Sequence, residues 1–315
     1  MMVIMSFLNA PDARTLGRVA GALAVDEAFV EKDWYVVQAI RALHLLANAD
    51  IAPIFSGGTS LLKGHGLIKR FSEDIDFKLG LSPAFLGLSG NQQRKALGDY
   101  KDALVSAWTA AGFAITDVPA RDANGFILVE MDYPSIIDEH DALRPHILAE
   151  LSAKPPRMLP QEKSLSSYVN EFRALAAEVA CIACVDPVET AADKLSAFTW
   201  RMIVRDRASP RDDPTIVRHL HDLAALEPVI SGSDAFPALL AATLIADSLR
   251  GGDVTARLTP AERLLAMLER LESDPHYADE YGRFVGGMAF AGEREIPSFA
   301  SAVQAITRLC AKLPS

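Results

Sequence analysis

The chain has 315 residues, of which 50% are hydrophobic and 23% are charged. This composition is typical of a globular protein with a sizeable core, and the length favours two subdomains. A net charge of −10 argues against a protein that coats nucleic acid nonspecifically, although it allows one that holds nucleic acid in a small basic cleft. No apolar run approaches the roughly 18–20 residues of a membrane-spanning helix. The short apolar start at Met1–Leu8 has no basic segment, so we expect no signal peptide, no membrane association and a cytoplasmic protein.

The first part of the chain alternates helical and strand patterns. Ala10–Leu45 has apolar residues at helical spacing, and Ile51–Phe55 is a short apolar run that ends in a glycine turn, which is typical of a strand. A short helix is expected over Thr59–His65. Glu73–Leu79 alternates apolar and charged residues, the period of a half-buried strand. After a Gly/Pro/Ser-rich loop at Gly80–Gly90, the patterns predict one helix and three strands, at Gln92–Ala111, Phe113–Asp117, Phe126–Met131 and His146–Leu151.

Three prolines in Lys154–Pro160 mark the expected subdomain boundary. Residues 1–155 would form a core with N-terminal helices, and residues 156–315 a mostly helical subdomain. We expect Cys181 and Cys184 to lie on a strand, where residues three apart point to opposite faces and would not share a zinc ion. Beyond this strand come several helices, two of which begin with N-capping patterns at Asp186–Glu189 and Thr259–Glu262.

One stretch combines an anion-binding pattern with a pair of carboxylates. At Gly57 and Gly58 the backbone can approach a phosphate because no Cβ stands in the way. The following helix offers free N–H groups and the positive end of its dipole, and Lys63 lies about one turn in, within reach of the outer phosphates. Asp74 and Asp76 are two apart on a predicted strand, so both project from the same face. Two hard oxygen ligands on one face suit Mg²⁺.

Together these parts meet the needs of nucleotidyl transfer, in which two metal ions about 3.5–4 Å apart commonly clamp the attacking and leaving oxygens. A third carboxylate is expected from a neighbouring strand. Glu150 is the candidate because it is a lone acid in an apolar strand, and a buried acid needs a partner. Each pattern alone is common, since a glycine turn is usually only a turn and alternating acids are often a solvated face. Their order along the chain is what indicates a site.

The same stretch resembles the signature of the AbiEii/AbiGii family of nucleotidyltransferase toxins, which includes the mycobacterial MenT toxins. That signature is approximately GGT-x-L-x-K, then R-x-S-x-D-I-D after six residues, and the chain matches it at Gly57, Gly58, Thr59, Leu61, Lys63, Arg70, Ser72, Asp74, Ile75 and Asp76. Three further segments resemble the family, namely Glu31–Asp33, Ala192–Ala197 with Arg201, and Arg218–Leu223.

The resemblance implies an α/β fold of the α+β type, with a polymerase-β-like mixed sheet, flanking helices and a helical C-terminal subdomain. It implies the toxin of a bacterial toxin–antitoxin or phage-defence system, which transfers NMP from an NTP with Mg²⁺ or Mn²⁺. Its partners would be a cognate antitoxin and an RNA acceptor, for which the tRNA 3′ end is the candidate. The implied catalytic residues are Asp74, Asp76, Lys194 and Asp222. The implied nucleotide-binding residues are Gly57, Gly58, Thr59, Ser60, Lys63, Arg70, Ser72 and Arg201. The implied metal ligands are Asp74, Asp76 and Glu150.

Two other functions remain open at this point. One is a nucleotidyltransferase that acts on a small molecule or a protein. The other is a nucleotide-binding interaction module that has lost catalysis, against which the intact Asp74 and Asp76 speak. A kinase is disfavoured because the chain lacks the kinase signature set.

Overall fold

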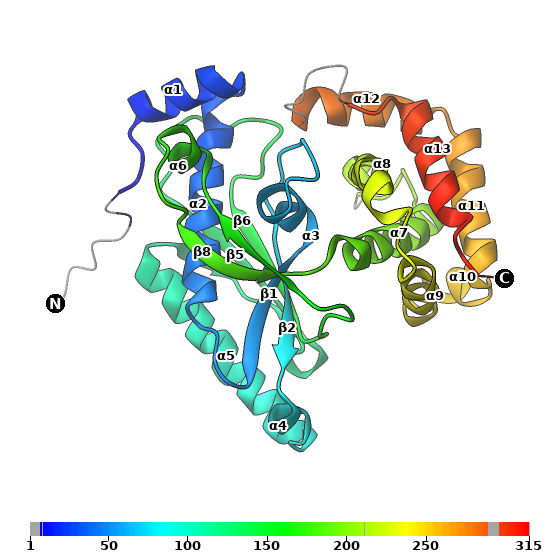
Figure 1. Ribbon diagram of the computed structural model, residues 1–315, viewed down its shortest axis with the longest axis horizontal. Coiled ribbons are helices and arrows are strands. Elements are labelled where there is room, and N and C mark those ends of the chain that lie inside the picture. Colours follow the sequence, from blue (N-terminus) through cyan, green and yellow to red (C-terminus); the bar gives the residue numbers. More distant parts are fainter. Residues whose placement is uncertain (1–6, 8, 211, 289–295, 315) are drawn as a thin grey trace. The chain divides into compact units, whose positions relative to one another are not determined.

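The computed structural model describes residues 7, 9–210, 212–288 and 296–314 (Figure 1). Most of the apolar start at Met1–Leu8 therefore lies outside the described residues. The chain divides into two compact units. Unit 1 comprises Met1–Gly66 and Phe71–Val185, and unit 2 comprises Leu67–Arg70 and Asp186–Ser315. In the described part of the chain, no helix is long and apolar enough to cross a membrane.

Unit 1 is built on a mixed sheet, as the sequence predicts. Its described strands are β1 Ile51–Ser56, β2 Ile75–Leu81, β3 Ala114–Asp117, β4 Ala120–Arg121, β5 Phe126–Asp132, β6 Ile147–Ser152, β7 Gln161–Leu165 and β8 Val179–Cys184. The strand order is β3-β5-β6-β2-β1-β8-β7, and β4 pairs with β5. The β1/β8 and β2/β6 pairs are parallel and the other pairs are antiparallel.

The division between the units falls later than the prolines of Lys154–Pro160 suggested. Strands β7 and β8 continue the sheet of unit 1 past these prolines, because β8 pairs with β1 at Phe55 and Cys184. Such pairing between distant segments leaves no signal in the local sequence. The cysteine strand itself is confirmed, since β8 holds Cys184 buried and Cys181 exposed.

Helices flank the sheet of unit 1 (Figure 1). They are α1 Ala13–Leu23, α2 Glu27–His44, α3 Gly57–Thr59, the π-helix η1 Ser60–Gly64, α4 Pro83–Leu86, α5 Gly90–Ala111, the 3₁₀ turn η2 Asp122–Asn124 and α6 Tyr168–Phe172. Helix α2 is central, because every residue from Ala28 to Val37 is buried. Helix α5 packs on it, and the buried Trp108 indole donates a hydrogen bond to the Ala39 carbonyl at 2.9 Å.

The described elements of unit 2 are all helical. They are α7 Pro187–Val204, the 3₁₀ turn η3 Pro214–Val217, α8 Arg218–Ile230, α9 Phe236–Ala246, α10 Gly252–Ala256, α11 Pro260–Ser273, α12 His276–Met288 and α13 Phe299–Cys310. Both predicted N-caps are confirmed. The Asp186 carboxylate caps α7 by accepting from the Val188 amide, and Thr259 and Glu262 form a capping box at α11.

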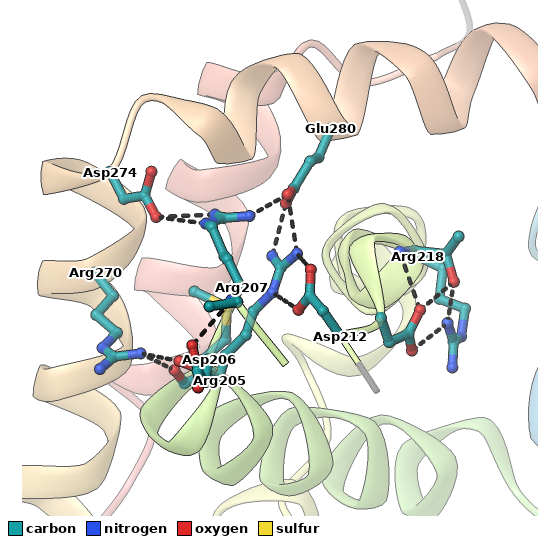
Figure 2. A network of polar contacts seen from close by, with 12 residues as sticks. Arg205, Asp206, Arg207, Asp212, Arg218, Arg270, Asp274 and Glu280 are labelled. Carbon is teal, nitrogen blue, oxygen red and sulfur yellow. Dashed lines mark hydrogen bonds and ion pairs between the residues drawn. The ribbon is translucent and has the colours of Figure 1, made fainter. Parts of the chain in front are cut away.

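A network of ion pairs holds the segment that follows α7 against α12 (Figure 2). The Arg205 guanidinium lies 2.7 Å from Asp212 and 2.7 Å from Glu280. Arg207 pairs with the same Glu280 and with Asp274. Glu280 is only 6% exposed, so its carboxylate is the buried centre shared by both guanidinium groups.

Candidate active site

A glycine turn at the end of β1 brings the backbone against a predicted catalytic acid. Gly57 has φ +75°, and a Cβ built there would lie 1.8 Å from the Asp76 Oδ2 atom. Only glycine accommodates this conformation and this close approach. The turn continues through Gly58, Thr59 and Ser60, all buried, into the π-helix η1, a form that is frequent at functional sites. The predicted glycine turn and the Asp76 carboxylate are therefore in direct contact.

The sheet register places three predicted or adjacent site residues in one row. Asp76 pairs with Ser56 of β1 on one side and with Glu150 of β6 on the other. Residues at paired positions in neighbouring strands have side chains on the same face. Glu150 thus lies on the neighbouring strand next to Asp76, where the sequence suggested a third carboxylate.

Asp74 lies just before β2 and has a cationic neighbour. The Arg144 Nη1 atom lies 2.5 Å from Asp74 Oδ1, and the two side chains are 41% and 33% exposed. The Thr59 hydroxyl donates to the Asp74 carbonyl at 2.5 Å and lies 3.0 Å from the Ser72 hydroxyl. Thr59 and Ser72, both predicted to bind nucleotide, therefore fix the approach to β2 through hydrogen bonds within unit 1.

The carboxylates suit a divalent cation in their chemistry but are not gathered into a ligand cluster. In the part of the chain that the structure describes, no group of three His, Cys, Asp or Glu side chains is arranged to hold a metal ion. Asp76 and Glu150 are neighbours in register, and Asp74 is paired with a guanidinium group. Since hard oxygen ligands are those that Mg²⁺ prefers, these three residues would hold the ion once Arg144 moved from Asp74.

Lys63 is buried in an ion pair. Its Nζ atom lies 2.6 Å from Asp33 Oδ1, with side chains 3% and 2% exposed, and 3.4 Å from the centroid of the Tyr168 ring. It also donates to the Ser166 carbonyl at 3.2 Å. Burial raises the pKa of the Asp33 carboxyl, and the Lys63 ammonium opposes that rise. In this structure Lys63 joins η1 to α2, and contact with a phosphate would require that pair to open.

Unit 2 contains a buried cluster of opposite charges around Asp222. The Arg70 guanidinium binds both Asp222 oxygens at 2.7 Å, the Lys194 Nζ atom lies 2.8 Å away, and His221 Nδ1 lies 3.5 Å away. Burial raises the pKa of the Asp222 carboxyl, but Arg70, Lys194 and His221 outweigh it and hold that pKa well below its usual range. Arg201, on the same helix as Lys194, places its guanidinium 5.4 Å from the Trp200 ring centroid.

The predicted site residues thus fall into two groups. Unit 1 brings together Gly57, Gly58, Thr59, Ser60, Ser72, Asp74, Asp76 and Glu150. Unit 2 brings together Arg70, Lys194 and Asp222. Two predicted residues lie in other contacts, Lys63 of unit 1 with Asp33 and Arg201 of unit 2 with Trp200. Sequence reasoning missed Arg144, which pairs with Asp74, and the ion pair of Lys32 with Glu73, the residue before Asp74. The signals for Lys32 were the charged run at Glu31–Asp33 in a helical pattern and the resemblance of that segment to the family.

The chain is similar to a protein family and to solved structures. The model of the family described as "Nucleotidyl transferase AbiEii toxin, Type IV TA system" matches residues 44–305. The chain is also similar to the structure of MenT4, a nucleotidyltransferase toxin from Mycobacterium tuberculosis, with 17% sequence identity and a TM-score of 0.48. That similarity covers 92% of this chain and 98% of the other. No curated protein matches.

Proposed function

The chain belongs to the AbiEii family of nucleotidyltransferase toxins of type IV toxin–antitoxin systems, and we propose that it transfers NMP from an NTP to the 3′ end of an RNA, with tRNA as the acceptor. In this reaction the 3′ oxygen of the acceptor forms a bond to the α-phosphorus of the NTP, and its hydroxyl proton passes to water. The bond from the α-phosphorus to the oxygen that bridges it to the β-phosphorus breaks, and pyrophosphate leaves. The proposal includes dependence on Mg²⁺ or Mn²⁺, action in the cytoplasm and a cognate antitoxin.

The observation that supports this function best is the row of Asp76 and Glu150 beside the Gly57 turn. Asp74, Asp76 and Glu150 would hold the metal, which when bound stabilises the charge on the attacking and leaving oxygens. The backbone N–H groups at Gly57 and Gly58 would bind the triphosphate, since glycine adds no Cβ beside them. Triphosphate binding and metal binding would therefore fall to neighbouring residues, on the Gly57 turn and on strands β2 and β6.

The roles proposed for residues of unit 2 come from the sequence motifs that resemble the family. Lys194, Asp222 and Arg70 are proposed to position nucleotide or acceptor, with Arg201 on the same helix. The structure supports a fixed position for Lys194, whose ammonium is anchored by Asp222 with the side chain 11% exposed. A small molecule or a protein as acceptor would require the same residues in unit 1. The labelling experiment below distinguishes these acceptors from RNA.

The test is to incubate the chain with each α-³²P-labelled NTP, total RNA and Mg²⁺. We expect label in the tRNA fraction, its loss on chelation by EDTA, and growth arrest when the chain is expressed alone. Asp76→Asn should abolish labelling without unfolding the chain. Asp99→Asn, which removes an exposed charge paired with Lys95, is the matched control and should label normally.

Each other outcome would contradict a stated part of the proposal. Label on a protein or a small molecule would overturn the tRNA acceptor and keep the enzyme class. Labelling that survives EDTA would overturn the metal requirement. Normal labelling by Asp76→Asn would show that the catalytic acids lie elsewhere.

A further inference from the structure

Helix α2 buries three consecutive charged residues in its middle. Glu31, Lys32 and Asp33 are 2%, 0% and 2% exposed, although these residue types are almost never fully buried unless they are paired. Successive residues of an α-helix are about 100° apart around its axis, so the three side chains point in three directions. Each of them contacts a different segment of unit 1.

The two acids, Glu31 and Asp33, hold other segments of unit 1. Glu31 accepts hydrogen bonds from the Ser135 hydroxyl at 2.6 Å and from the Ile136 amide at 2.8 Å. Asp33 accepts from the Tyr168 amide at 2.7 Å, in addition to its ion pair with Lys63. These contacts fix the segment that follows β5 and the first residue of α6.

Lys32 holds the two segments that lead into the catalytic strands. Its Nζ atom donates to the Glu73 carboxylate, to the Arg144 carbonyl and to the His146 carbonyl, the last at 3.0 Å. An ammonium has three N–H donors, and all three are used. The Glu73 carboxylate also accepts from the Arg144 amide at 3.1 Å. Glu73 directly precedes Asp74, and His146 directly precedes β6.

Those segments lead directly into the paired ends of β2 and β6. The two strands are parallel and their register starts with Ile75 opposite Ala149 and Asp76 opposite Glu150. No hairpin sets the register of a parallel pair. A slip of one residue would turn Glu150 to the opposite face of the sheet and separate it from Asp76.

We propose that Lys32 is a positioning residue for nucleotidyl transfer, which sets Asp76 and Glu150 side by side by joining the starts of β2 and β6. The inference rests on the proposed function, because it assigns Asp76 and Glu150 to that reaction. Lys32 contacts neither substrate nor metal in this role. Loss of such an indirect support typically lowers metal affinity or activity about 10- to 100-fold.

The test uses the full-length double variant Lys32→Met with Glu73→Gln, which removes both charges together and leaves no unpaired buried ion. Mn²⁺ binding is measured by electron paramagnetic resonance, and amide hydrogen exchange is measured peptide by peptide. We expect Mn²⁺ binding to weaken about tenfold or more and exchange to accelerate at Ile147–Glu150 but not in β3. Lys95→Met with Asp99→Asn makes the same change in an exposed pair on α5 and should alter neither.

The inference is overturned if the double variant keeps wild-type Mn²⁺ affinity and unchanged amide exchange in β6. Lys32 would then contribute to the stability of the fold without positioning the carboxylates. If the wild-type chain binds no Mn²⁺, the proposed metal site is wrong, and the exchange of β6 still decides whether Lys32 orders that strand. If the double variant does not fold, Glu73→Gln alone is measured. Faster exchange at Ile147–Glu150 then supports the inference, and unchanged exchange overturns it.

Discussion

Removal of the Asp222 carboxylate should destabilise unit 2 strongly. Asp222 is fully buried and its carboxylate pairs with Arg70 and Lys194, so Asp222→Ala leaves two cations without their counter-charge. Removing one partner from a buried ion pair typically costs about 3–5 kcal/mol. Because 1 kcal/mol corresponds to roughly 2–4 °C for a domain of about 150–250 residues, we expect the melting temperature to fall by roughly 6–20 °C.

The individual cations should matter less than the carboxylate. Lys194→Met removes one 2.8 Å contact and leaves Asp222 bound by both nitrogens of Arg70. The loss should be about 1.5–3 kcal/mol, the net worth of a hydrogen bond to a charged group. If Lys194 also acts in the reaction, its replacement should lower activity far more than this small loss of stability explains.

The pH dependence follows from the depressed pKa of Asp222. A carboxylate whose pKa is lower in the folded than in the unfolded chain contributes stability that is complete above the unfolded value, about 4. That contribution is lost as the pH falls through the folded value. The deficit of Asp222→Ala should therefore be the same at neutral and mildly acidic pH and should shrink only in strong acid.

Differential scanning calorimetry of the purified variants measures these differences. Asp99→Ala is the matched control, because it removes an exposed carboxylate that pairs with Lys95 and surface changes of this kind stay within about 0.5 kcal/mol. The reasoning is refuted if Asp222→Ala melts within about 2 °C of the wild type, or if Lys194→Met destabilises as much as Asp222→Ala does.

Two further predictions concern the glycine turn and the ion-pair network. Gly57→Ala places a Cβ 1.8 Å from the Asp76 Oδ2 atom in a left-handed conformation, so we expect a loss of about 1–3 kcal/mol and of most NMP transfer. Unchanged turnover would argue against Asp76 as catalytic, and Gly21→Ala, which meets open space, is the control. Glu280→Gln removes the charge that Arg205 and Arg207 share and should lower the free energy of unfolding in urea by about 2 kcal/mol. An unchanged free energy of unfolding would show that Asp212 and Asp274 alone hold the two guanidinium groups.

Strands β1 and β2 could be predicted because their signals are local. Alternating residues define β2, an apolar run defines β1, and both end at or near the predicted positions. The suggestion that Glu150 lies on a strand next to Asp76 agrees with the observed register. The later helices could be located in the same way, because their caps are short sequence patterns.

Other parts depend on contacts that the local sequence does not encode. The charged run in α2 has the pattern of a solvated helix face, and only distant partners such as Glu73 and Tyr168 make its burial stable. The placement of Lys63 against Asp33 could not be foreseen for the same reason. Strand β7 has a mostly polar sequence at the edge of the sheet, so no hydrophobic alternation marked it.

The segment Leu67–Arg70 affects when unit 2 can complete its folding during synthesis. It belongs to unit 2, although it is translated between two strands of unit 1. Arg70 lies 152 residues ahead of Asp222, which at the usual rates of synthesis corresponds to a delay of about 8–30 s. Throughout this interval Arg70 lacks Asp222, the carboxylate that it binds in the folded unit. The charge cluster of unit 2 therefore cannot form on the ribosome until α8 has been synthesised, and a fragment that starts at Asp186 lacks one of its cations.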